Sequence, residues 1–554
     1  MKNKKIFLPG MILLLIIQLC VALFFCAQKQ GLHYDEYYSY YSSNVTYGLH
    51  PTDMEWKDTE EIRSEFMALP GEGFNYGMVK LMQSWDVHPP LYYYVLRTVS
   101  VLSAGVFSKW QGLSINLLFF VLSWIILALI TKELTGNDRK VTAIVCALFG
   151  FSPAIFSGIT FIRMYMMLTF ACLLILYVHI RAITRERLSF VSFYVPVILL
   201  SFVGFQIHYY FAVFLFFMAA AVSLYLFFYK GTRKTSFLYA AAVLLGMFLS
   251  IVAYPSCVSH IFKGYRGTEA QDAFFDISNI GQRFNFFFDL TNEYAFGGML
   301  VVLVLVIILL GLTWKVKSNA TAISRANTIN MKKDVPADSV VQNSSGRGTK
   351  WSPQKQAIML ILFVTMGYFL VVAKTALLNA EEAIRYEMPI YGLLIMLVVL
   401  CLDKQAAVFT TDKNKKWIQG VFLGLMGLTL AGQIYGLMQG KVCFLYPQDK
   451  LNVEWAKAQQ KEDVVYIYNP ANQWMIWDES EELMQYEQIY FVNSMQENVV
   501  SDENLSETEH VYVYKMRGEE ADAVFEKLVE ENGGFGEIRL IRELLYCDLY
   551  ELER

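Results

Sequence analysis

Long apolar runs dominate the pattern of hydrophobic and polar positions along this 554-residue chain. They measure about 17–25 residues, the length that an α-helix needs to cross roughly 30 Å of hydrocarbon. The first run, 7–27, follows three lysines and lacks a small-residue cleavage site, so we interpret it as a retained span rather than a signal peptide. The further spans that the pattern predicts are 91–107, 112–131, 141–158, 164–182, 190–206, 209–228, 236–255, 298–313, 356–378, 388–402 and 416–438.

The charges between the runs predict which connections lie inside the cell. Basic residues are concentrated in 132–140, 181–187, 230–234 and 314–355. Connections rich in lysine and arginine remain cytoplasmic, so we expect these four connections inside, together with the basic N-terminus. The segments expected outside are 28–90, the region around 158–163, the turn near His208, 256–297, 379–387 and everything after 439.

One conflict concerns the second apolar run, 91–107. A chain that is outside at residue 90 and inside at residue 132 must cross the membrane an odd number of times, once or three times. Two apolar runs lie between these residues. Either 91–107 enters the membrane without crossing it, or one side is assigned wrongly. The expected fold is therefore an α-helical polytopic membrane protein with roughly 11–13 transmembrane helices.

The character of the chain changes in the tail, 441–554. The short runs "DVVYIYNP", "QIYFVNS" and "HVYVYKM" are typical of strands, and "EEADAVFEKLVEENGG" has helical spacing. We therefore predict a membrane domain over 1–440 and a small extracytoplasmic α/β domain over 441–554. Within the first domain, 28–90 is the first extracytoplasmic loop, in which 48–88 could form short helices on the membrane surface. The polar segment 314–355 is expected to be a flexible cytoplasmic linker.

Composition supports this picture, with 55% hydrophobic and only 17% charged residues. The net charge of −4 gives no reason to expect a nucleic-acid partner, and none is predicted. Six of the eight cysteines lie in or beside apolar runs and are most simply small core residues. The other two, Cys443 and Cys547, could form a disulfide if the tail is extracytoplasmic, although spacing alone cannot show that they are close.

An acidic pair follows the first span directly, in the stretch "GLHYDEYYSY". Asp35 and Glu36 lie there among aromatic residues that include Tyr34 and Tyr37. Ionisable groups at the membrane edge are costly, which makes them candidates for function. The alternative is an ordinary acidic start to a loop.

A second polar stretch, "SWDVHPPLYYYVLR", precedes the next helix. It carries Asp86 and His88, then two prolines that keep the chain extended, then Tyr92. A proline-initiated helix with an interfacial aromatic belt is the alternative explanation.

Further polar side chains are expected on the same outer face. Arginine and lysine bind phosphate oxygens through charge-assisted hydrogen bonds, and a nearby carboxylate can take a proton from a hydroxyl. An acidic pair with several cations therefore suits a phosphate-bearing lipid substrate, although each residue alone could be a snorkelling arginine or a structural histidine. The additional candidates are Arg163, Tyr165, His208, Tyr209, Arg266, Lys374, Arg385 and Tyr386.

This ordered set of motifs is similar to the GT-C superfamily of membrane glycosyltransferases. The nearest branch is that of the protein O-mannosyltransferases and the lipid A aminoarabinose transferase, and the similarity covers roughly residues 1–440. The resemblance implies an inverting glycosyltransferase that moves a sugar from a polyprenyl-phosphate donor to an extracytoplasmic glycan, lipid or protein. Three tyrosines follow "HPPL", where the mannosyltransferases carry Gly-Lys, and the luminal repeat domain of that branch is absent. Mannose and a protein acceptor are therefore not specifically implied.

The resemblance also implies roles for individual residues. Asp35 matches the catalytic base and Glu36 its acceptor-side neighbour. His88, with Asp86 beside it, matches a loop that lines the donor phosphate, and Arg163 and Arg385 match cations near that phosphate. We also expect Arg266 and Lys374 to contact this phosphate. The residues expected to line the substrates are Tyr34, Tyr37, Asp86, Tyr92, Tyr165, His208, Tyr209 and Tyr386. The leaving group is already a phosphate monoester, so no general acid is required.

Two points remain open from the residues alone. No cofactor is required, but Asp35, Glu36, Asp86 and His88 could supply ligands for Mg²⁺, Mn²⁺ or Zn²⁺. The alternative function is a transporter or flippase of a lipid-linked sugar, which would place its charges near the middle of the bilayer and often show inverted repeats. Charges that cluster at one face, with no internal repeat, favour the enzyme. A non-catalytic scaffold would lack the acidic pair.

Overall fold

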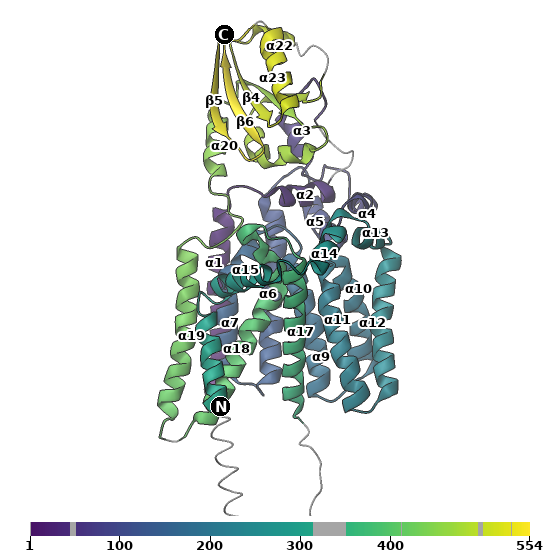
Figure 1. Cartoon of the computed structure of the whole chain (residues 1–554), viewed down its shortest axis with the longest axis vertical. Helices are drawn as coiled ribbons and strands as arrows, with labels where there is room; N and C mark the ends of the chain where they lie inside the picture. Colours follow the sequence, from purple (N-terminus) through teal and green to yellow (C-terminus); the bar gives the residue numbers. More distant parts are fainter. Residues whose placement is uncertain (1, 45–50, 314–350, 412, 497–501, 533) are drawn as a thin grey trace, which may run out of the picture. The chain divides into compact units, whose positions relative to one another are not determined.

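Long helices lie alongside one another in much of the computed structural model (Figure 1). The structure describes residues 2–44, 51–313, 351–411, 413–496, 502–532 and 534–554. Most of the predicted linker, 314–355, therefore lies outside the described residues.

Nine helices in the described part of the chain are long and apolar enough to cross a membrane. This confirms a multi-pass membrane protein. Three of the nine combine an α-helical stretch with a short π- or 3₁₀-helical one. The nine are α1 (Lys2–Gln28), α6 (Lys109–Leu134), α9 (Tyr165–Thr184), η1–α10 (Phe190–Tyr194 and Val195–Ile207), α11–η2 (Tyr210–Leu224 and Tyr225–Tyr229), α12 (Arg233–Ala253), α17 (Pro353–Thr375), η4–α18 (Ala380–Glu387 and Met388–Phe409) and α19 (Lys415–Met438).

Two further helix pairs qualify only when their sharp bends are accepted, which gives up to 11 spans among the described residues. The first pair, α7 (Arg139–Gly150) and α8 (Pro153–Thr160), bends by 52°. Pro153 explains this bend because proline lacks the N–H that would continue the helix. The second pair joins Ile280–Ala295, which contains α15 (Ile280–Leu290) and η3 (Thr291–Ala295), to Leu300–Thr313 at 98°. Gly297 and Gly298 lie in that break, with φ values of 58° and 81°.

The expected span 91–107 was wrong. The structure has a helix of 12 residues there, α5 (Leu91–Leu102). At about 1.5 Å per residue this helix is roughly 18 Å long, well short of the hydrocarbon thickness. Only α6 is then left to cross between residues 90 and 132, which removes the parity conflict.

Gln433 of α19 stabilises both helix bends. At the first bend, Ser152 N–H donates to Phe149 O rather than Leu148 O, and Gln433 Nε2 donates to Leu148 O at 2.9 Å. The same amide group donates to Ala295 O, at the second bend, at 2.6 Å. Because lipid offers no hydrogen bonds, backbone carbonyls released at a bend need such partners inside the protein.

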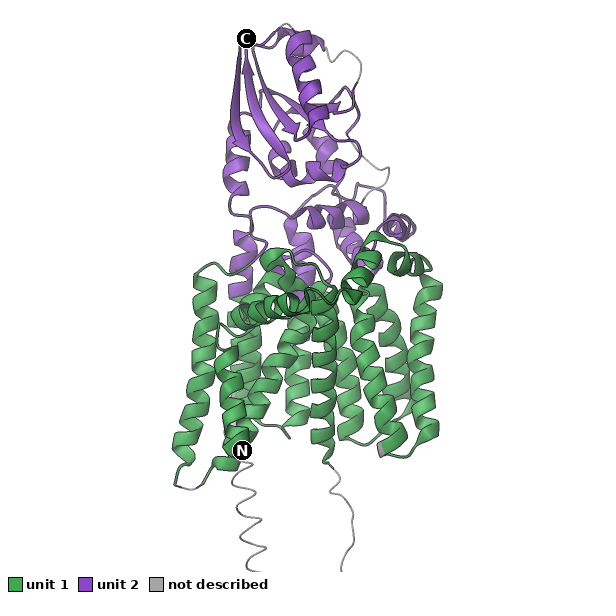
Figure 2. Cartoon of the chain, in the orientation of Figure 1, with its two compact units in different colours: residues 1–20, 119–158, 165–442 green, residues 21–118, 159–164, 443–554 purple. Residues whose placement is uncertain are grey.

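The chain divides into two compact units (Figure 2). Unit 1 comprises Met1–Cys20, Phe119–Gly158 and Tyr165–Val442, and unit 2 comprises Val21–Leu118, Ile159–Met164 and Cys443–Arg554. Unit 1 holds most of the membrane helices, together with α13 (Ser256–Phe262) and α14 (Tyr265–Phe275). Both α1 and α6 contribute residues to each unit.

Unit 2 contains a mixed six-stranded sheet in the order β1-β3-β2-β4-β6-β5. The three central strands are parallel, and the others are antiparallel to their neighbours. The strands are β1 (Glu55–Asp58), β2 (Asp463–Tyr468), β3 (Gln488–Asn493), β4 (His510–Met516), β5 (Glu537–Glu543) and β6 (Cys547–Glu553). The helices are α2 (Tyr34–Asn44), α3 (Thr59–Ser64), α4 (Tyr76–Trp85), α5, α20 (Asp449–Ala458), η5 (Gln473–Glu479), α21 (Ser480–Leu483), α22 (Glu503–Glu507) and α23 (Glu519–Glu531).

The predicted strands and helix of the tail are confirmed, since β2, β3, β4 and α23 coincide with the patterns that predicted them. An aliphatic core including Val465, Ile467, Val513 and Leu528 joins α23 to these strands. The first loop departs from the expectation in one respect. Part of 48–88 is a strand, β1, which pairs antiparallel with β3 so that Glu55 lies opposite Phe491.

All eight cysteines are free thiols in the structure. Cys547 is buried and Cys443 is half-buried, so the disulfide that their position allowed is not formed.

Candidate functional site

The two adjacent carboxylates open α2 and have very different surroundings. The side chain of Asp35 keeps 27% of its surface exposed, whereas that of Glu36 has none. Acidic residues in the first turn of a helix are favoured by the positive end of the helix dipole, which accounts for both positions. Asp35 is therefore the member of the pair that a substrate could reach.

Glu36 is held by three donors. Its Oε2 accepts from Lys29 Nζ at 2.8 Å and from the His33 N–H at 2.7 Å, and its Oε1 accepts from the Ile162 N–H at 2.6 Å. Lys29 is also fully buried, and it donates to Phe444 O at 2.6 Å. Burial lowers the pKa of Lys29, and the Glu36 carboxylate offsets part of that shift. A buried ion pair with additional hydrogen bonds holds chain segments together.

The segment 159–164, which carries Arg163, is fixed by three neighbours in unit 2. Asn116 Nδ2 of α6 donates to Ile159 O at 3.1 Å and to Phe161 O at 2.6 Å. The Phe161 ring stacks on Phe444 with a centroid separation of 4.0 Å. The Ile162 N–H reaches Glu36, as described above. This segment is therefore placed by a helix, a carboxylate and an aromatic ring from distant parts of the chain.

Arg163 is the centre of the polar cluster, and only 3% of its surface is exposed. Its Nη1 donates to Asp35 O at 3.1 Å, Ser39 Oγ at 3.0 Å and Tyr93 Oη at 3.1 Å. Its Nη2 lies 3.4 Å from His88 Nε2. The guanidinium thus binds the first turns of α2, the start of α5 and the loop before α5.

Asp86 and His88 form an ion pair in that loop, with Asp86 Oδ2 2.8 Å from His88 Nδ1. Burial alone would raise the pKa of Asp86, but the charge and hydrogen bond of His88 and the charge of Arg163 lower it overall. The side chain of His88 is 20% exposed, so one edge of the ring is accessible.

We call Asp35, Ser39, Asp86, His88, Tyr93 and Arg163 the Arg163 cluster, and all six lie in unit 2. The cluster places a partly exposed carboxylate beside a buried guanidinium and a partly exposed imidazole. A carboxylate can take a proton from a hydroxyl, and a guanidinium in a low-dielectric site can stabilise a phosphate oxygen. This combination could serve a transfer reaction in which a phosphate departs.

The other predicted residues of unit 2 differ in their access to a substrate. Tyr37 and Tyr92 are fully buried, and the Tyr37 ring packs on Phe66 with a centroid separation of 4.9 Å. Tyr34 is half-buried and contacts the rings of His33 and Trp474. Of the three tyrosines predicted to line a substrate in this unit, only Tyr34 keeps a partly exposed ring.

The remaining predicted residues belong to unit 1, where three of them, Tyr165, His208 and Tyr386, form an aromatic group. Tyr165 lies between His208 and Tyr386, with centroid separations of 5.5 and 6.0 Å. Tyr209 bonds through its hydroxyl to His260 Nδ1 at 2.9 Å. Arg385 is buried, and its Nη2 donates to the Tyr386 hydroxyl at 3.3 Å.

The two other predicted cations of unit 1 have protein partners. Lys374 is buried and donates to Asp276 O and to Asn279 Oδ1. Arg266 pairs with Glu269 one helical turn further on, at 2.9 Å. Their proposed contact with a donor phosphate stays a prediction.

Sequence reasoning missed several members of the site. Ser39 and Tyr93 contact Arg163, and Lys29 neutralises Glu36. Lys29 carried a usable signal, since a lysine directly after an apolar span and close to an acidic pair is a candidate ion-pair partner. Ser39 and Tyr93 carried no such signal. Each lies in a run of similar residues, "YYSYYSSN" and "LYYYV", from which the sequence alone does not single it out.

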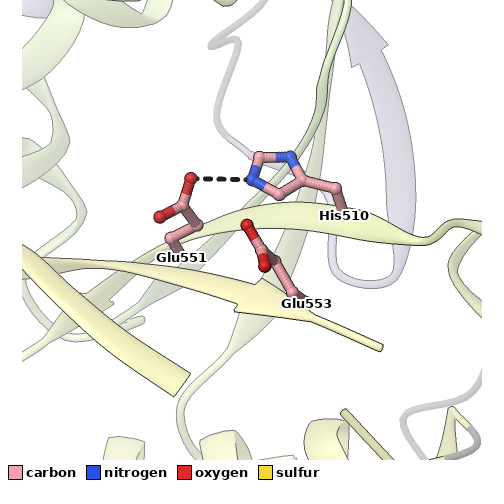
Figure 3. Close-up of side chains that lie close together, drawn as sticks. All are labelled: His510, Glu551 and Glu553. Carbon is pink, nitrogen blue, oxygen red and sulfur yellow. Dashed lines mark hydrogen bonds and ion pairs between the residues drawn. The ribbon is translucent and has the colours of Figure 1, made fainter. Parts of the chain in front are cut away.

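The residues considered as metal ligands from the sequence, Asp35, Glu36, Asp86 and His88, do not form a close group of three ligand atoms in the described part of the chain. The ligand atoms that do lie within 4.8 Å of one another there belong to His510, Glu551 and Glu553 (Figure 3). Glu551 already accepts from His510, Tyr512 and Arg539. A carboxylate with these donors, one of them a guanidinium, is better explained as part of an ion-pair network than as a metal ligand.

Gly112 of α6 permits the close approach of the segment 159–164. A Cβ at this position would lie 3.1 Å from Ile162 Cβ and closer still to its Cγ2 methyl. We expect Gly112→Ala to destabilise the protein by about 1–3 kcal/mol, the usual cost of overpacking, because a β-branched side chain yields poorly. Gly424→Ala is the matched control, since a Cβ there meets nothing within 4 Å. Thermal unfolding in detergent should show a lower Tm for the first variant only, and equal Tm values would contradict the close approach.

Comparisons with known proteins give little further information. No protein-family model matches the chain, and no curated protein matches it either. Among solved structures, the chain is similar to ArnT from Cupriavidus metallidurans in the apo state, with 9% identity, a TM-score of 0.49 and coverage of 98% of both chains. A likeness at this level carries no information about activity.

Proposed function

We propose that the protein is an inverting glycosyltransferase that moves a sugar from a polyprenyl-phosphate donor to an extracytoplasmic acceptor. The observation that carries the proposal is the Arg163 cluster, in which a buried guanidinium joins the partly exposed Asp35 turn to the Asp86–His88 pair. A cation fixed in advance, next to a carboxylate that can reach a substrate, suits a hydroxyl nucleophile and a phosphate leaving group.

The reaction is a single displacement. Asp35 takes the proton of the acceptor hydroxyl. At the same time the oxygen of that hydroxyl forms a bond to the anomeric carbon of the donor. The bond from that carbon to the phosphate oxygen breaks at the same time, and the electron pair leaves with polyprenyl phosphate. Arg163 and the accessible edge of His88 stabilise the departing phosphate. Glu36 holds the Asp35 turn and Arg163 in place and does not take part in proton transfer.

The proposal needs no resident metal, because the single negative charge of the phosphodiester donor can be neutralised by the Arg163 guanidinium. We also propose that a divalent cation has no essential role, although the sequence alone left that open. Activity that disappears on chelation and returns with Mg²⁺, Mn²⁺ or Zn²⁺ would contradict this part.

The experiment is a transfer assay with purified full-length protein. Together with a panel of acceptors, it should be incubated separately with polyprenyl-phosphate sugars, polyprenyl-diphosphate sugars and nucleotide sugars, and the leaving group of each donor (polyprenyl phosphate, polyprenyl diphosphate or the nucleotide) should be measured. We expect release from the first class only. Movement of the intact lipid-linked sugar across a vesicle membrane, with no cleavage, would instead identify a transporter or flippase.

The proposed donor depends on the side of the membrane on which the cluster lies. Unit 2 should face outside and the basic connection at 230–234 inside, because basic connections remain cytoplasmic. In a background without the native cysteines, Ser506→Cys should react with a membrane-impermeant maleimide in intact cells, and Lys234→Cys should not. Both positions are exposed in the structure. The reverse labelling pattern would remove the main reason for a lipid-carried donor.

A further inference from the structure

A short connection in unit 1 exposes large apolar side chains. It comprises residues 274–280, from the end of α14 to the start of α15, and we call it the α14–α15 turn. None of the residues of α14 is buried either. A contiguous exposed apolar patch on a folded protein marks a surface for a partner or for a membrane. The apolar side chains of the turn, with their exposed fractions, are Phe274 at 46%, Phe275 at 78%, Ile277 at 79% and Ile280 at 44%.

The α14–α15 turn has a well-defined hydrogen-bonded conformation. Asp276 Oδ1 accepts from the Ser278 N–H at 2.9 Å and from the Ser278 hydroxyl at 2.6 Å. The Asp276 N–H donates to Asp272 O at 3.0 Å, at the point where α14 ends. Phe275 and Ile277, on either side of Asp276, are therefore held outward by the fold of the turn.

The turn is attached to one end of the spanning helix α17 (Figure 1). Lys374 Nζ, in the last turn of α17, donates to Asp276 O and to Asn279 Oδ1. Arg283 of α15 donates through Nη1 to Ala376 O, the C-cap carbonyl of α17, at 2.7 Å. Two cations thus hold the turn and the start of α15 at this end of α17.

The face of α17 that carries Lys374 also carries a stripe of exposed apolar residues. Helix residues four positions apart lie on one face, and the stripe ends at Leu370, four positions before Lys374. Lys374 itself is only 5% exposed, with the turn bound to its ammonium group. Because α17 is long and apolar enough to cross a membrane, the stripe faces lipid. Its other members are Met359, Leu362, Phe363 and Met366.

The α14–α15 turn therefore continues the lipid-facing side of α17 at the membrane surface. Lys374 lies about 6 Å beyond Leu370 along the helix axis, at 1.5 Å per residue. Hydrogen bonds from the Ser278 hydroxyl and N–H lower the pKa of Asp276, so its carboxylate is charged at neutral pH. A charged carboxylate stays at the level of the lipid headgroups, whereas neighbouring aromatic and aliphatic side chains can enter the adjoining acyl chains.

We propose that the α14–α15 turn is a membrane-interface anchor, in which Phe275 and Ile277 insert into the acyl chains just below the headgroups. The occupant of this surface is lipid because the turn borders the lipid-facing stripe of α17. The anchor ties α14 and the start of α15 to the membrane surface. It does not depend on the proposed transfer reaction, since neither inserted side chain belongs to the Arg163 cluster.

The test is depth-dependent fluorescence quenching in liposomes. Full-length protein without its native cysteines carries a nitrobenzoxadiazole label at Ile277→Cys, in phosphatidylcholine that contains a nitroxide-labelled lipid. We expect a nitroxide near the headgroup to remove most of the emission, and a nitroxide near the middle of the bilayer to remove less. Phe275→Cys should give the same result, which keeps the test valid if one variant folds poorly. Both variants should retain their Tm in detergent, because the replaced side chains are exposed.

Two further positions calibrate the depth. Phe363→Cys, half-way along α17 on the lipid-facing stripe, should be quenched more strongly by the nitroxide near the middle of the bilayer. Ser506→Cys, exposed in unit 2, should be quenched by aqueous iodide and by neither lipid. If the label at Ile277→Cys behaves like the one at Ser506→Cys, the turn lies in water. If it is protected from iodide and from both lipids, another protein molecule covers the turn. Either result would overturn the proposal.

Discussion

Asp35→Asn should abolish glycosyl transfer while leaving Tm in detergent unchanged. The amide keeps the shape of the side chain but cannot accept a proton, and loss of a positioned base costs roughly 10²–10⁴-fold in rate. The carboxylate of Asp35 is partly exposed and lies 3.7 Å from His33 Nδ1, so replacing its charge should cost the fold little. Single-turnover release of polyprenyl phosphate, at saturating donor and acceptor, measures the effect.

Glu36→Gln is the informative comparison, because the neighbouring carboxylate is buried against Lys29. Removing one member of a buried ion pair costs about 3–5 kcal/mol, so this variant should lose Tm as well as activity. A fully active Asp35→Asn variant would refute the role given to Asp35. An inactive Glu36→Gln variant with wild-type Tm would transfer that role to Glu36.

Arg163→Ala should weaken donor binding far more than acceptor binding. A hydrogen bond to a charged group contributes about 1.5–3 kcal/mol, and 1.4 kcal/mol is tenfold, so the donor KM should rise by roughly 10–150-fold. Arg163→Lys should recover only part of the loss, because an ammonium cannot reproduce the three contacts made by Nη1 and the approach of Nη2 to His88. Donor titration at saturating acceptor separates the two substrates.

Arg97 provides the matched control, as another buried arginine of unit 2. Its guanidinium binds Gly73 O, Asn44 O and Glu72, all in the first loop or at the end of α2. Arg97→Lys should therefore lower Tm with no selective effect on the donor KM. Equal changes in donor and acceptor KM for the Arg163 variants would show that Arg163 supports the fold only.

The membrane helices could be predicted from the sequence because the length of an apolar run is a direct physical requirement of the bilayer. That criterion failed for 91–107, where Ser100 and Ser103 are followed by Gly105 and the helix ends at Leu102. Tyr92, Tyr93 and Leu96 of α5 are buried by packing inside the protein, and a run that faces lipid would look the same in the sequence. Composition cannot distinguish the two environments.

The sheet could be predicted only in part. β2, β3 and β4 are buried parallel strands and have clear apolar runs, whereas β5 is mostly exposed and alternates charged with apolar residues. β1 is only four residues long, and its partner lies more than 400 positions away, so nothing local marks it as a strand.

The candidate site shows the same division. Asp35, Asp86, His88 and Arg163 were named from motifs, and the structure brings them into one network, although their roles stay predictions. The difference between Asp35 and Glu36 could not be predicted. It depends on the Ile162 N–H, which is 126 positions from Glu36, and on Phe444 O, which is 415 positions from Lys29.

The pairing of β1 with β3 has a consequence for biosynthesis. The loop that carries β1 emerges from the ribosome early, but its partner strand is made after almost every membrane helix. Phe444, which stacks on Phe161 and binds Lys29, is also made late. A chain still being translated therefore carries an unpaired strand edge and an incompletely held Arg163 segment. Stop codons placed before residue 443 should yield inserted but inactive chains whose first loop is open to proteases, so that catalytic competence arrives only with the last fifth of the polypeptide.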